Sequence, residues 1–98
     1  MGPSRVDPLA ALRDEPGRAG VLLDFDGTLA SIVPSAADAR PLAGAPEVLR
    51  ALAGRYAVVA VVSGRPVAFL AEHLPSAVRL IGLYGLEWTD GATVQEYP

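Results

Sequence analysis

The stretch VLLDFDGTLA, from Val21 to Ala30, places two carboxylates at the end of an apolar run. Val21 and two leucines lead into Asp24, and a single phenylalanine separates Asp24 from Asp26. Burying an ionised carboxylate without a partner costs on the order of several kcal/mol, so a strand that only packed a core would exclude Asp24. The stretch therefore predicts a strand that ends at a functional site.

Apolar runs rich in β-branched residues alternate along the chain with segments of helical periodicity. Strands buried on both faces are predicted over residues 21–25, 57–62 and 79–83. Three helices are predicted, each with a proline in its first turn: Pro8, Pro46 and Pro66. The tail, residues 86–97, is expected to form a hairpin that turns at Asp90 and Gly91. This order predicts an α/β fold: a partial Rossmann-like parallel sheet with helices on both faces and a C-terminal hairpin.

The composition excludes several classes of protein. The chain of 98 residues has a net charge of −3 and no basic run, which argues against binding to nucleic acid or to an anionic membrane. Cysteine is absent, so disulfides and cysteine-ligated metals are excluded. The longest clean apolar run, residues 57–62, is too short to cross a membrane, and Pro3, Asp7 and Asp14 interrupt any signal peptide. We expect a soluble, cytoplasmic protein.

The ends of the first two predicted strands carry polar residues. Asp24 ends the first strand, and Ser63 follows the second directly. Ligands of open α/β sheets bind outside the carboxyl ends of the strands, and consecutive strands joined by a crossover are usually neighbours. We therefore expect Asp24 and Ser63 to face one pocket.

The residue types at these strand ends suit phosphoryl transfer. A carboxylate such as Asp24 can attack phosphorus and form an aspartyl phosphate, while Asp26 can act as general acid and base. Hydroxyl groups, a backbone that approaches closely at glycine, and a guanidinium can hold the phosphate; the candidates are Thr28, Ser63, Gly64 and Arg65. Two carboxylates beside a phosphate dianion repel it, so a hard cation, most simply Mg²⁺ held at Asp24 and Asp26, is expected.

Structural roles compete with these functional ones. Asp26-Gly27 could form only a turn, as the same dipeptide is expected to do at Asp90-Gly91. Ser63 could cap a helix rather than bind phosphate. Arg65 could be a surface charge, and whether Glu87 faces the pocket stays open. The aromatic residues Tyr84 and Trp88 are expected to pack within the last strand and hairpin.

The motifs DFDGTL and SGR, at the ends of consecutive strands, resemble those of the haloacid-dehalogenase-like phosphatases. Together with GLYGLEW, and at similar spacing, they are similar to the N-terminal pattern of the trehalose-6-phosphate phosphatase family over roughly residues 20–91. The resemblance implies Asp24 as nucleophile and Mg²⁺ ligand, Asp26 as general acid/base with its carbonyl on the metal, and Ser63 as phosphate ligand. The implied reaction is hydrolysis of trehalose 6-phosphate.

The chain also departs from that family pattern. Such enzymes use a later lysine, sometimes an arginine, on the phosphate and a later acidic pair on the metal, whereas this chain has no lysine and no adjacent acidic pair after Ser63. The cap domain that would recognise the sugar is absent too. We therefore expect residues 1–98 to be the truncated N-terminal part of a phosphatase core domain, inactive by itself and able to self-associate through an exposed sheet edge.

Two alternatives stay open. The full-length protein could be another sugar-phosphate phosphatase or a phosphomutase of the same superfamily. The chain could also be a non-catalytic truncated binding module. The sequence does not determine the preferred sugar, the oligomeric state, the residues that supply the missing lysine and acidic ligands, or whether the chain is a natural truncation or a fragment.

Overall fold

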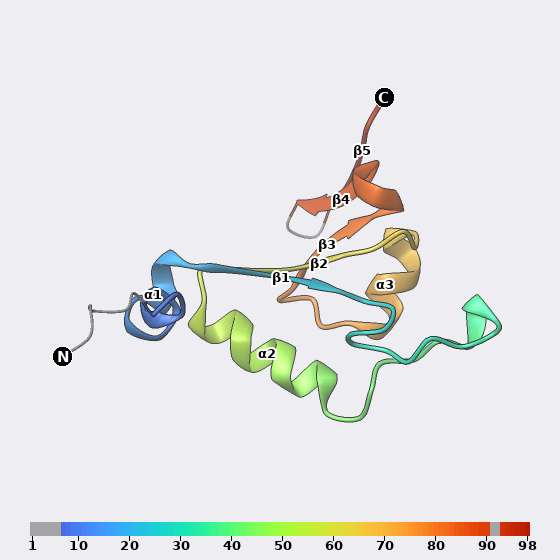
Figure 1. The fold of residues 1–98 in the computed structure, drawn as a ribbon. Coiled ribbons are helices and arrows are strands. Elements are labelled where there is room, and N and C mark those ends of the chain that lie inside the picture. Colours follow the sequence, from blue (N-terminus) through green and yellow to red (C-terminus); the bar gives the residue numbers. More distant parts are fainter. Residues whose placement is uncertain (1–6, 91–92) are drawn as a thin grey trace.

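A computed structural model of the protein describes residues 7–90 and 93–98 (Figure 1). The elements follow the predicted order. The helices are α1 (Ala10–Asp14), α2 (Ala45–Arg55) and α3 (Val67–His73), and the strands are β1 (Gly20–Asp24), β2 (Val58–Val62), β3 (Arg79–Gly82), β4 (Glu87–Asp90) and β5 (Thr93–Glu96). Short 3₁₀ turns lie at Pro16–Arg18, Ala36–Asp38 and Leu83–Gly85. None of the described helices is long and apolar enough to cross a membrane.

The strands form one five-stranded mixed sheet in the order β1-β2-β3-β4-β5. β1, β2 and β3 are parallel, whereas β4 and β5 are antiparallel to their neighbours. The α/β fold, the parallel core of the sheet and the C-terminal hairpin are thus confirmed. The turn is predicted at Asp90-Gly91, but Asp90 is the last residue of β4 and pairs with Thr93, while Gly91 lies outside the described residues.

Both crossover helices pack on the same face of the sheet (Figure 1). Leu49 of α2 and Leu70 of α3 are fully buried in one core cluster with Val59 and Val61, which are alternate residues of β2 and so share a face. The expectation of helices on both faces is therefore wrong for α2 and α3. The strand order runs without reversal, and right-handed crossovers then place successive helices on one side.

β1 is half-exposed rather than buried on both faces. Val21 and Leu23 pack against the core, whereas the side chain of Leu22 points to the uncovered face and Leu22 is 68% exposed. Asp24 is exposed as well, so the carboxylate remains hydrated and the cost of burying it does not arise. Asp24 lies at the end of the strand, as predicted. The argument from the cost of burying its carboxylate is wrong, because Asp24 is exposed.

The loop between β1 and α2 is closed by contacts between its own two halves. Ala30 forms an isolated antiparallel bridge to Pro41, and the Leu42 N–H donates to the Leu29 carbonyl at 2.7 Å. Helix α2 then begins after Gly44, whose φ of 87° suits glycine. This loop returns the chain to the face on which α2 packs, and it leaves the carboxyl end of β1 open.

Candidate phosphate site at the strand ends

The register of the parallel strands brings the predicted site residues to one edge of the sheet. Asp24 at the end of β1 pairs with Val62 at the end of β2, and Val62 pairs with Ile81 of β3. Ser63 follows Val62 directly, and its N–H donates to the Ile81 carbonyl at 2.9 Å. Asp24 and Ser63 therefore leave neighbouring strands at the same level, as the sequence predicts.

The turn after β1 is fixed by a buried aromatic residue and a glycine. Phe25 has no exposed surface, and its carbonyl accepts the N–H groups of Leu29 and Ala30 at 2.9 and 3.0 Å. Gly27 has a φ of 81°, and its N–H donates to the Ala30 carbonyl. A side chain at Gly27 would be strained in this left-handed conformation, which explains the glycine after Asp26.

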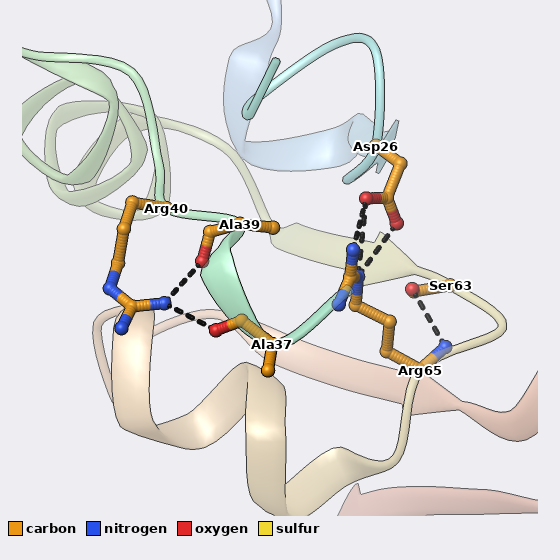
Figure 2. A network of polar contacts seen from close by, with 6 residues as sticks. All are labelled: Asp26, Ala37, Ala39, Arg40, Ser63 and Arg65. Carbon is orange, nitrogen blue, oxygen red and sulfur yellow. Dashed lines mark hydrogen bonds and ion pairs between the residues drawn. The ribbon is translucent and has the colours of Figure 1, made fainter. Parts of the chain in front are cut away.

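Arg65 reaches from the loop after β2 to the carboxylate of Asp26 (Figure 2). Its Nη2 lies 2.6 Å from Oδ1, and its Nε lies 2.9 Å from Oδ2. Two parallel bonds of this kind match the planar guanidinium to the planar carboxylate, and they are stronger than bonds between neutral groups. The structure thus pairs two residues that the sequence assigns to separate roles.

Two aromatic rings support the guanidinium. The Cζ atom of Arg65 lies 4.5 Å from the ring centroid of Phe69 and 5.6 Å from that of Phe25, and the two rings meet edge to face. Only 15% of the Arg65 side chain is exposed. Cation–π contacts of this kind contribute about 0.5–2 kcal/mol each. Arg65 is therefore part of a packed network, and its interpretation as a surface charge is wrong.

The ion pair changes the protonation of both partners. The hydrogen bonds from Arg65 lower the pKa of the Asp26 carboxyl, and its partial burial opposes this shift. The same bonds raise the pKa of Arg65. Asp26 is therefore a carboxylate at neutral pH, a state that suits a base and not a proton donor.

Ser63 and Gly64 form the turn that carries Arg65. Ser63 is 5% exposed, and its Oγ accepts the Arg65 N–H at 3.0 Å (Figure 2). This bond lies within the turn and is not the helix cap that competes with phosphate binding in the sequence interpretation, because the N-cap of α3 is Pro66. Thr28, by contrast, is exposed on the turn after β1, and within residues 7–90 and 93–98 the side chains of Asp24 and Thr28 accept no hydrogen bond.

The segment after β3 is tied to the same turn. Leu83 and Tyr84 have φ values of 49° and 55°, a left-handed conformation that costs on the order of 1–2 kcal/mol for each such residue. The Leu83 N–H donates to the Arg65 carbonyl and the Tyr84 N–H to the Ser63 carbonyl, both at 3.0 Å. Tyr84 is left 89% exposed, so the expectation that it packs within the last strand and hairpin is wrong.

Glu87 has a role that the sequence leaves open. Its Oε1 accepts the Val67 N–H, the first of helix α3, at 2.6 Å. A carboxylate at this position satisfies an unpaired N–H group and interacts favourably with the helix dipole. Gly82 permits the approach, because a Cβ there would lie 2.7 Å from the Arg65 carbonyl oxygen and 2.8 Å from the Val67 nitrogen. Glu87 therefore positions the Arg65 turn and does not face a ligand.

The donor set fits a Mg²⁺ ion only in part. Among the described residues, no group of three acidic or histidine side chains could hold a metal. Mg²⁺ is commonly held by one or two carboxylates, with water and phosphate oxygens in the remaining positions. The exposed Asp24 carboxylate can supply one such ligand, and the carboxylate of Asp26 is engaged by Arg65.

Comparison with known proteins places the chain in a family. The family model for trehalose-phosphatase matches residues 22–94, which include both carboxylates of the first motif and the whole Ser63 turn. The chain belongs to the trehalose-phosphatase family. It is 40% identical over 72 residues to a trehalose-phosphate phosphatase of Mycobacterium leprae, and 43% identical over 70 residues to one of Mycobacterium avium.

These matches cover most of this chain and little of the relatives. They span 74% and 70% of the chain, but 15% and 18% of the two mycobacterial proteins. The fold agrees with the trehalose-6-phosphate phosphatase C-terminal domain of C. albicans at a TM-score of 0.77 and 28% identity, and with the Aspergillus fumigatus trehalose-6-phosphate phosphatase at 0.74 and 30%. The chain covers 32% and 34% of those structures, and 90% of this chain is aligned in each.

Proposed function

We propose that this member of the trehalose-phosphatase family carries the nucleophilic half of a phosphomonoesterase site, with trehalose 6-phosphate as the substrate of the full-length protein. The observation that carries the proposal is the convergence of Asp24, the Asp26–Arg65 pair and Ser63 at one edge of the parallel sheet. A strand-end carboxylate in a trehalose-phosphatase family member supports phosphoryl transfer over a purely structural turn.

The reaction proceeds in two steps. A carboxylate oxygen of Asp24 attacks phosphorus, the bond from phosphorus to the sugar oxygen breaks, and Asp26 donates a proton to the leaving oxygen. Water then attacks the phosphorus of the aspartyl phosphate while Asp26 accepts its proton. The acyl–phosphate bond breaks, inorganic phosphate leaves and the Asp24 carboxylate is restored.

Arg65 links phosphate binding to the protonation of Asp26. In this structure Arg65 holds Asp26 as a carboxylate, which disfavours proton donation. A bound phosphate dianion competes for the same guanidinium, because phosphate oxygens accept the same bidentate bonds as a carboxylate. Transfer of Arg65 bonds to the phosphate raises the pKa of Asp26 and so favours the protonated acid that the first step needs.

In this proposal the Asp24 carboxylate and the main-chain carbonyl of Asp26 would hold Mg²⁺. Bound there, the ion would offset the repulsion between the carboxylates and the phosphate dianion. The phosphate itself is bound by the Ser63 hydroxyl, the Gly64 backbone, the Thr28 hydroxyl and Arg65.

A phosphoryl analogue tests the nucleophile directly. Beryllium trifluoride bonds to an aspartate oxygen as a phosphoryl group does, and ¹⁹F NMR of the purified chain with Mg²⁺ detects the bound species. We expect a bound resonance that Asp24→Asn abolishes. Asp14→Asn is the matched control, because Asp14 is an exposed carboxylate in α1 and makes the same change of charge.

The outcomes separate the proposed roles. A bound resonance that persists in Asp24→Asn would show that Asp24 is not the nucleophile. For residues 1–98 we expect binding of trehalose 6-phosphate without hydrolysis; the same outcome with the full-length protein would favour the alternative of a sugar-phosphate binding module. Assays of the full-length protein on several sugar phosphates distinguish a trehalose enzyme from another phosphatase or a phosphomutase of the superfamily.

A further inference from the structure

Tyr84 combines two properties that folding alone does not explain. It is the most exposed of the large apolar and aromatic side chains, at 89%, within the described part of the chain. Its backbone is also held in a left-handed conformation, with φ 55° and ψ 33°, and Leu83 before it has φ 49°. An aromatic ring in water forgoes the stabilisation that its burial would give, and a strained backbone adds a further cost.

The strained segment is anchored to the candidate phosphate site. The N–H groups of Leu83 and Tyr84 donate to the carbonyls of Arg65 and Ser63, so the conformation of the segment is set by the turn that carries these two residues. Residues in strained conformations persist where the surrounding structure determines them, and they cluster at functional sites. These bonds hold the backbone of Tyr84 beside the turn that carries Ser63 and Arg65.

The Tyr84 ring packs on Gly64, the residue between Ser63 and Arg65 in the sequence. A Cβ built on Gly64 would be 2.4 Å from Cζ of Tyr84, 2.6 Å from its hydroxyl oxygen and 2.7 Å from Cε2. A side chain at position 64 would therefore displace the Tyr84 ring from this contact. The hydroxyl end of the ring thus contacts the residue that joins Ser63 and Arg65, the two residues proposed to bind phosphate. Most of the ring surface is in contact with water.

We infer that Tyr84 forms one wall of a sugar subsite next to the phosphate, with a pyranose ring as its ligand. This inference rests on the proposed function, because the sugar is the group attached to a phosphate held at the Ser63 turn. The C–H face of a pyranose packs on an aromatic ring, and the phenol can exchange hydrogen bonds with sugar hydroxyls. Tyr84 would then act on affinity for the sugar and not on the chemical step.

The test compares ligands with and without the sugar and the phosphate. Saturation-transfer-difference NMR of the purified chain, with Mg²⁺ present, measures binding of glucose 6-phosphate and of trehalose, and ³¹P NMR measures binding of inorganic phosphate. For Tyr84→Ala we expect a roughly 2- to 10-fold loss of affinity for glucose 6-phosphate and loss of the trehalose signal, with phosphate affinity unchanged. Tyr84→Phe separates the ring from its hydroxyl, and Tyr97→Ala, which removes another exposed tyrosine, is the matched control.

A further variant distinguishes a binding role from a structural one. Tyr84→Gly relieves the left-handed strain, so we expect its melting temperature to be unchanged or higher while sugar binding is lost. Destabilisation of the variant, or equal loss of phosphate and glucose 6-phosphate affinity, would overturn the inference in favour of a structural role.

Trehalose alone keeps this test independent of the phosphatase proposal. If trehalose contacts the wild type and not Tyr84→Gly, the subsite holds even where beryllium trifluoride fails to bind Asp24. If neither trehalose nor glucose 6-phosphate shows contact that depends on Tyr84, the subsite is refuted even where beryllium trifluoride binds Asp24.

Discussion

The bond between Asp26 and Arg65 is the strongest polar link in the candidate site, and a double-mutant cycle measures it. Asp26→Asn removes the negative charge and retains the shape, while Arg65→Met retains an apolar stem against Phe69. The cycle compares the free energy of unfolding of the wild type, both single variants and the double variant, so contacts that Arg65 makes elsewhere cancel.

The expected coupling energy between Asp26 and Arg65 follows from the exposure of their side chains and the geometry of their hydrogen bonds. Hydrogen bonds to charged groups contribute about 1.5–3 kcal/mol when buried, whereas exposed ion pairs contribute about 0.2–1 kcal/mol. The Arg65 side chain is 15% exposed and that of Asp26 is 37% exposed, so solvent screens one partner and not the other. We expect a coupling energy of about 1–2 kcal/mol between these limits. Asp26→Asn should destabilise more than Arg65→Met, because it removes the charge that Asp26 presents to a largely buried guanidinium.

Urea unfolding followed by circular dichroism supplies the four free energies. The matched control is the same cycle on Asp7 and Arg13, an ion pair whose side chains are 47% and 59% exposed, and it should show a smaller coupling. A coupling between Asp26 and Arg65 no larger than that of the exposed pair would refute the reasoning. It would mean that the bidentate geometry and the stacking on Phe69 do not add to the stability of the fold.

Three further predictions concern pH, packing and association. Arg65 lowers the pKa of Asp26, so the ion pair stabilises the fold fully at pH values above 3.8, the ordinary pKa of an aspartate. This stabilisation is lost as the pH falls through the lowered pKa. NMR titration of Arg65→Met should show the pKa of Asp26 rising toward 3.8. Gly82→Ala should lower the free energy of unfolding in urea by about 1–3 kcal/mol, because the added Cβ meets backbone atoms. Gly54→Ala in α2 adds a Cβ in open space and should be neutral or stabilising. Equal effects of the two substitutions would contradict this prediction. β1 is an edge strand of the sheet and carries the exposed Leu22 on the uncovered face, so we expect self-association that sedimentation detects and Leu22→Lys weakens. A monomeric wild type at high concentration would argue against it.

Periodicity predicts the elements of this chain well because it reports on local structure. The helix whose apolar face comprises Val67, Leu70 and Leu74 buries all three of these residues. The predicted strands at residues 57–62 and 79–83 match β2 and β3 to within one residue at either end. In these segments the local preference and the tertiary packing agree, so the apolar periodicity is sufficient to predict the elements.

Periodicity does not predict burial correctly where the burial of an apolar face depends on a second element that covers it. Val48 and Leu49 are neighbouring apolar residues of α2, yet Val48 is 57% exposed and Leu49 is fully buried. Leu22 is apolar and exposed for the same reason, since no crossover helix covers its face. A helical or strand pattern marks a face as apolar, but it does not supply the element that covers it.

By itself, the sequence determined the type and order of the elements, the family, and the placement of Asp24 and Ser63 at neighbouring strand ends. These follow from local periodicity and from the general rule that parallel strands end at one edge. The tertiary structure alone decided that Arg65 pairs with Asp26 and that Glu87 caps α3, contacts between residues 39 and 20 positions apart. It also decided that Tyr84 is exposed over Gly64. Such contacts depend on the twist of the sheet and the approach of separate loops, and no local pattern encodes that geometry.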